Sequence, residues 1–118
     1  MKRFLRSVKH ASHGIGYTLT HERNFRLELI IGVFTTVLMF ALPLTREERM
    51  IVVLVMVCVF VLELINTSVE RIVDILKPRI HPYARIAKDV MAAAVLISAL
   101  GAAIIGVSIF YPYIRVLL

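Results

Sequence analysis

The chain of 118 residues has one cysteine, Cys58, and only 19% of its residues are charged. A lone cysteine cannot form a disulfide within the chain, which excludes a small disulfide-stabilised scaffold. Soluble domains carry about 25% charged and roughly 45–50% apolar residues, whereas 59% of this chain is hydrophobic. Walker A, GxGxxG, HRD and DFG sequences are missing, which excludes a soluble kinase fold. A small membrane protein with one domain, residues 1–118, remains.

The charge balance is 14 basic against 8 acidic residues, or +6. This apolar content argues against nucleic acid as a partner. The basic residues gather in the N-terminal segment and in the stretch 77–88, while residues 45–49 form a short turn of mixed charge. By the positive-inside tendency, we expect the N-terminus and the loop 77–88 to face the cytoplasm.

Residues 1–26 have the pattern of an amphipathic helix that lies on the membrane surface. At 100° per residue, one face is apolar and the opposite face is cationic, the two sets being Phe4, Val8, Ala11, Ile15 and Leu19, and Lys2, Arg6, Lys9 and His13. Basic residues recur throughout, unlike in a signal peptide. A break near Gly14 and Gly16 is an open alternative, since glycine weakens a helix.

Three apolar stretches follow, at residues 27–44, 50–76 and 90–110. A helix needs about 20 residues to cross a hydrocarbon core of about 30 Å, and a shorter one can span with local thinning. The sequence therefore predicts an all-α integral membrane protein with three transmembrane helices. A series of small residues in the third stretch, from Ala92 to Gly106, predicts close helix packing.

A stripe of polar residues interrupts the second stretch. Glu63, Asn66, Glu70 and Asp74 fall within about 80° of one another on a helix. At about 1.5 Å per residue from Met50, Glu63 lies about 20 Å into the span and Glu70 about 30 Å. A carboxylate at that depth is costly unless it faces a partner or a polar interior, so it marks a functional site.

Charged residues of the other segments reach the same membrane level, namely Glu22, Arg26, Glu28, Lys88 and Asp89. Carboxylates beside basic groups suit Mg²⁺ and a polyphosphate, because Mg²⁺ takes one or two carboxylates plus phosphate oxygens. A deeper carboxylate could accept the proton of a lipid hydroxyl. The pattern indicates phosphoryl transfer to a membrane alcohol, catalysed mostly by positioning and charge neutralisation.

Other interpretations of these residues stay open. Glu70 and Asp74 alone could form a solvated helix end, Glu63 and Asn66 could make a structural interhelical hydrogen bond, and Lys88-Asp89 could be an interface anchor. A proton-coupled transporter subunit would place a carboxylate near the midplane, without a cluster at one face. A non-enzymatic membrane assembly subunit would leave the acidic stripe unexplained.

The motifs HERNF, ELINTSVERIVD and AKDVMAAAVL, in this order along the chain, resemble the small bacterial diacylglycerol kinase and undecaprenol kinase family. The resemblance covers nearly the whole chain. It implies an ATP- and Mg²⁺-dependent lipid kinase of the bacterial inner membrane, with its active site at the cytoplasmic face. It also implies a homotrimeric helical bundle whose active sites form between chains.

The same resemblance implies roles for the residues in the motifs. Glu63 would be the general base for the lipid hydroxyl, supported by Asn66, and Glu22 and Glu70 would hold Mg²⁺. Lys88 would meet the ATP phosphates.

The remaining implied contacts concern the nucleotide. Asp89 would orient Lys88 or the nucleotide. Arg3 falls at the N-terminal arginine that contacts ATP, with Arg6 as the alternative, and His10 falls where some relatives have an aromatic contact.

The lipid substrate is the last expectation from sequence. The segments NFRLE, HPYARIAKD and GVSIFYP are more similar to undecaprenol kinases of Gram-positive bacteria than to diacylglycerol kinases. We therefore expect phosphorylation of undecaprenol, with diacylglycerol as the alternative.

Overall fold

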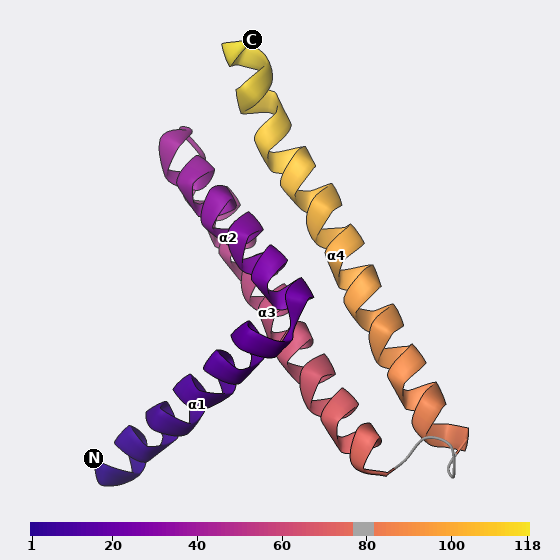
Figure 1. Ribbon diagram of the computed structural model, residues 1–118. Coiled ribbons are helices and arrows are strands. Elements are labelled where there is room, and N and C mark those ends of the chain that lie inside the picture. Colours follow the sequence, from indigo (N-terminus) through magenta and orange to yellow (C-terminus); the bar gives the residue numbers. More distant parts are fainter. Residues whose placement is uncertain (77–81) are drawn as a thin grey trace.

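A computed structural model describes residues 1–76 and 82–118 of the chain (Figure 1). It contains four helices: α1 (Lys2–His21), α2 (Arg23–Ala41), α3 (Arg46–Ile75) and α4 (Pro82–Leu117). Helix α2 runs antiparallel to α3, α4 runs along α3, and α1 leaves the other helices at a wide angle. Helices α2, α3 and α4 are each long and apolar enough to cross a membrane. The predicted all-α fold with three transmembrane helices is confirmed.

Helix α1 continues through both glycines, so a break at Gly14 or Gly16 is wrong. Each glycine costs about 1 kcal/mol relative to alanine, which a cooperative helix of 20 residues tolerates. The break comes instead at Glu22, whose φ of −109° and ψ of 111° are extended. Glu22 is therefore the only residue between α1 and α2, and the first helix ends at His21 rather than at residue 26.

The turn between α2 and α3 is fixed by a capping box. The Glu48 N–H donates to Thr45 Oγ1 at 3.2 Å, and the Thr45 N–H donates to Glu48 Oε2 at 2.9 Å. These bonds satisfy backbone donors that the first turn of a helix leaves without partners. A small apolar core lies at this end of the molecule, formed by Met39, Leu42, Leu44, Val52 and Phe110.

The long helices extend beyond the apolar stretches that predict them. Helix α3 begins at Arg46 rather than at residue 50, and α4 runs from Pro82 to Leu117 rather than over 90–110. An apolar run measures only the part of a helix inside the bilayer, while the helix itself continues into charged residues outside. Proline suits the first position of α4, where its missing N–H costs nothing. Lys77, Pro78, Arg79 and His81 of the expected cytoplasmic loop lie outside the described residues.

Helix α2 approaches α3 closely at Gly32, while the two glycines of α4 have open space beside them among the described residues. A Cβ atom at Gly32 would lie 2.9 Å from Cζ of Phe60, whereas nothing in the described chain lies within 4 Å of such an atom at Gly101 or Gly106. The small-residue series of α4 therefore makes no close contact at its two glycines within one chain. Most large apolar side chains of the three long helices are exposed, as expected for surfaces that face lipid or other subunits.

Candidate functional site

The centre of the candidate site is Glu63, in the C-terminal half of α3. Its side chain is only 1% exposed, and neither carboxylate oxygen has a hydrogen-bond partner among the described residues. A buried carboxylate without a partner is strongly unfavourable, because it loses hydration and gains nothing in return. An ionised Glu63 would therefore need a cation, a proton or a hydroxyl donor that the described residues do not supply.

Three further carboxylates surround Glu63 within electrostatic range. Glu22 and Glu70 repel the Glu63 charge, and Glu63 in turn repels Glu28 on α2. Oε2 of Glu28 is also buried without a partner in the described part of the chain. Glu22, Glu63 and Glu70 thus lie near one another in the structure, and their roles as site residues stay a prediction.

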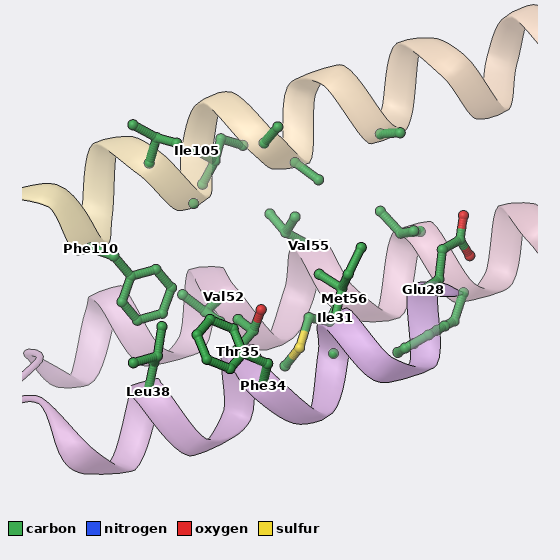
Figure 2. A pocket seen from close by; sticks show the side chains of 18 of the residues that line it. Glu28, Ile31, Phe34, Thr35, Leu38, Val52, Val55, Met56, Ile105 and Phe110 are labelled. Carbon is green, nitrogen blue, oxygen red and sulfur yellow. The ribbon is translucent and has the colours of Figure 1, made fainter. Parts of the chain in front are cut away.

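Glu28 is the member of this group that has no assigned role in the sequence motifs. The sequence indicated it only as an acid near the start of the first apolar stretch, at the level where the other acids arrive. The structure adds that it lines the rim of an apolar pocket (Figure 2).

Asn66 contacts Glu70 rather than Glu63. Its Nδ2 donates to Glu70 Oε1 at 3.5 Å, one helical turn further on, while its own Oδ1 is buried and makes no hydrogen bond to any described residue. Asn66 therefore supports the outer carboxylate of the stripe and keeps an acceptor free for a ligand.

Glu22 is placed by the bend between α1 and α2. Its N–H donates to the Thr18 carbonyl at 2.8 Å and ends α1, while its own carbonyl accepts from the Arg26 N–H. Its side chain is 17% exposed and pairs with Arg71 of α3, with 2.7 Å between Oε1 and Nη2. Glu22 reaches the site because the chain turns at this residue.

Lys88 comes to the site from the second turn of α4. Its Nζ donates to Asp74 Oδ1 at 3.0 Å, and the other oxygen of Asp74 lies 3.6 Å from Arg71 Nη1. Lys88 is thus held by the last acid of the α3 stripe, whereas its neighbour Asp89 is exposed. The proposed effect of Asp89 on Lys88 stays a prediction.

The N-terminal residues expected to contact ATP lie far from these carboxylates within one chain. Arg3 and His10 are exposed on α1. At about 1.5 Å per residue, Arg3 is about 28 Å and His10 about 18 Å along the helix from Glu22, and Arg6 lies between them. One chain does not bring Arg3, Arg6 or His10 to Glu63.

An apolar pocket of about 500 Å³ lies between α2, α3 and α4 (Figure 2). Figure 2 shows Ile31, Phe34, Val52, Val55, Ile105 and Phe110 along it, with Glu28 at one end. Glu28 is the only charged side chain among its lining residues in the described chain. The pocket is thus apolar along its length, and its charged residue, Glu28, belongs to the carboxylate cluster.

The donor set suits a hard cation. No group of three or more histidine, cysteine, aspartate or glutamate side chains stands ready to hold a metal within residues 1–76 and 82–118. Mg²⁺ does not need one, because it keeps waters and binds through one or two carboxylates together with substrate phosphates. Glu22 and Glu70 each have one oxygen in a hydrogen bond, which leaves the other for a ligand.

Comparison with known proteins identifies the family. The chain is 38% identical to undecaprenol kinase of Bacillus subtilis over 112 residues, which cover 95% of this chain and 91% of that protein. It is 35% identical to a diacylglycerol kinase of Synechocystis over 90% of this chain and 61% of that protein, and 33% identical to one of Helicobacter pylori over 81% and 75%. Residues 9–110 match the prokaryotic diacylglycerol kinase model. The resemblance drawn from the sequence motifs is confirmed, and the chain belongs to the prokaryotic diacylglycerol kinase family.

Proposed function

We propose that this protein transfers the γ-phosphate of ATP to the hydroxyl of undecaprenol at the cytoplasmic surface of the membrane. The observation that carries the proposal is the buried Glu63 carboxylate, which has no hydrogen-bond partner in the described chain and lies among other acids. Family membership supports lipid kinase chemistry, and the likeness to the Bacillus undecaprenol kinase supports undecaprenol over diacylglycerol.

In the transfer step, Glu63 acts as the general base. The lipid hydroxyl gives its proton to the Glu63 carboxylate as its oxygen forms a bond to the γ-phosphorus. The bond between that phosphorus and the β,γ-bridging oxygen breaks, and ADP leaves with the electron pair. A carboxylate shielded from water is suited to this role, because no solvent molecule competes for its lone pairs.

Residues around Glu63 help to neutralise the negative charge of the phosphates. Glu22 and Glu70 would hold Mg²⁺, which neutralises phosphate charge when it is bound. Lys88 supplies a cation at the same level once its bond to Asp74 is exchanged for a phosphate. Asn66 keeps Glu70 in place, and Asp89 orients Lys88 or the nucleotide.

The lipid tail occupies the apolar pocket between α2, α3 and α4. Its volume of about 500 Å³ lies in the range of ligand sites in proteins, about 300–1,000 Å³. Glu28 stands at the end of the pocket that leads to Glu63. A lipid in this pocket would present its hydroxyl to the carboxylates.

The active enzyme is a homotrimer with sites shared between chains, its N-terminus facing the cytoplasm. Arg3, or its neighbour Arg6, and His10 are too far from Glu22 along α1 to complete the site of their own chain. Exposed apolar side chains on α4, such as Leu96 and Ile97, provide surface for subunit contacts. The basic N-terminal segment favours the cytoplasmic side of a bacterial inner membrane.

The direct test is a phosphorylation assay with γ-labelled ATP and purified protein in lipid. Undecaprenol and diacylglycerol are compared as acceptors, with Glu63→Gln as the inactive variant and Glu47→Gln as a control, since Glu47 is exposed at the opposite end of α3. We expect labelled undecaprenyl phosphate from the parent and the control only. Equal rates with diacylglycerol would reject the undecaprenol preference, and no labelled lipid from a folded parent would reject the kinase.

A further inference from the structure

One cation, Arg71 of α3, connects the end of α1 to the last turns of α3. Its Nη2 lies 2.7 Å from Glu22 Oε1, its Nε donates to the Tyr17 hydroxyl at 2.7 Å, and its Nη1 lies 3.6 Å from Asp74 Oδ2. We call these four side chains the Arg71 clasp. Only a guanidinium has the planar fork of donors that serves several acceptors at once.

The clasp fastens α1 to α3. Every side-chain hydrogen bond that the described residues make between α1, with its end residue Glu22, and α3 passes through Arg71. Tyr17 is further fixed within α1, where its ring stacks on His21 at 4.0 Å between centroids. Thr18 is the only buried residue of α1, so apolar packing contributes little to its attachment.

The clasp also determines where the Glu22 carboxylate lies. Glu22 is repelled by Glu63, and an unpaired side chain would turn away toward water. Arg71 holds one of its oxygens with a charge-assisted bond, which leaves the second oxygen for another ligand. The Arg71 side chain is 40% exposed and that of Glu22 is 17% exposed, so the pair lies nearer the surface than Glu63.

We propose that Arg71 is a positioning residue of the kinase site, which fixes Glu22 and the end of α1 so that Glu22 can receive the metal–nucleotide complex. This inference rests on the proposed function for the role of Glu22. The attachment of α1 follows from the clasp geometry alone. A lysine at position 71 keeps the charge but cannot serve Tyr17 and Glu22 together.

The experiment compares Arg71→Gln, Arg71→Lys and Tyr17→Phe with the parent. Arg85→Gln is the control, because Arg85 is an exposed arginine on the first turn of α4 at the same membrane face. A nitroxide at His13→Cys, in a Cys58→Ser background, reports the mobility of α1 by electron paramagnetic resonance. Kinase assays give KM for MgATP and kcat separately, and circular dichroism with size exclusion verifies folding.

We expect Arg71→Gln to increase label mobility and to raise KM for MgATP about tenfold, with a smaller change in kcat. Arg71→Lys should recover part of both effects, Tyr17→Phe should act mainly on mobility, and Arg85→Gln should behave as the parent. Unchanged KM in Arg71→Gln overturns the positioning role, even if mobility rises. If Arg71→Gln does not fold, the same criterion applies to Arg71→Lys.

The two proposals fail in different ways. A parent without kinase activity refutes the proposed function, while the label still tests whether Arg71 holds α1. An active parent whose Arg71 variants match it in mobility and in KM refutes the clasp alone.

Discussion

The hydroxyl of Tyr113 donates a 2.5 Å hydrogen bond to Oε2 of Glu48, which ties the last turns of α4 to the first turn of α3. The same carboxylate oxygen accepts the Thr45 N–H that closes the capping box. One side chain therefore fixes both the turn before α3 and the end of α4. This contact lies at the opposite end of α3 from Asp74, so it belongs to the scaffold and not to the carboxylate site.

Tyr113→Phe should destabilise the protein without affecting catalysis. The variant loses one hydrogen bond to a charged acceptor, which typically contributes about 1.5–3 kcal/mol. Thermal unfolding in detergent measures the change, with Tyr111→Phe as the control because the Tyr111 side chain is exposed. A loss of kcat comparable to that of a variant at Glu63 would contradict the separation of scaffold and site.

Glu63→Gln should abolish turnover while leaving nucleotide binding intact. The amide keeps the size of the side chain but cannot accept the proton of the hydroxyl, and such a loss typically costs about 10²–10⁴ in rate. Steady-state assays measure kcat, and titration with a fluorescent ATP analogue measures binding. Turnover near the parental rate would remove Glu63 from its role as general base.

Glu70→Gln should weaken binding of the metal–nucleotide complex more than it slows the chemical step. Glu70 has one oxygen bonded to Asn66 and the other available, so the amide would lose a charged ligand at this position. The measurement is the dependence of activity and of nucleotide binding on Mg²⁺ concentration. Unchanged Mg²⁺ dependence in Glu70→Gln would refute its role as a ligand; Glu47→Gln serves as the matched control.

Gly32→Leu should lower the melting temperature by separating α2 from α3. A Cβ at this position already lies 2.9 Å from the Phe60 ring, and a larger side chain must displace it, at a typical cost of about 1–3 kcal/mol. Gly101→Leu is the control, since nothing in the described chain lies within 4 Å of a Cβ there. Equal melting temperatures for Gly32→Leu and the parent would contradict close packing of α2 against α3 at Gly32.

The sequence predicts the helices and the acidic stripe of α3 because both follow from local periodicity. The sequence predicted that Glu22 and Glu63 lie at a similar membrane depth, because the charged residues of each segment fall at the same interface. The contact between Glu22 and Arg71 was not predictable, because it depends on the direction in which α1 leaves the bend. Nothing in the ELINTSVERIVD motif indicated a separate role for Arg71.

Errors at the helix ends have a common cause. Counting apolar residues predicts where a helix enters the bilayer, so the charged first turns of α3 and α4 were left out. The ion pair between Lys88 and Asp74 was also not predictable from local spacing. Adjacent residues on a helix point about 100° apart, so the nearer partner in space came from another helix.

The single extended residue between α1 and α2 links the direction of α1 to the position of one carboxylate. Glu22 is both the residue at which the backbone turns and a carboxylate of the candidate site. A change in the angle between α1 and α2 would therefore change how this carboxylate faces Glu63.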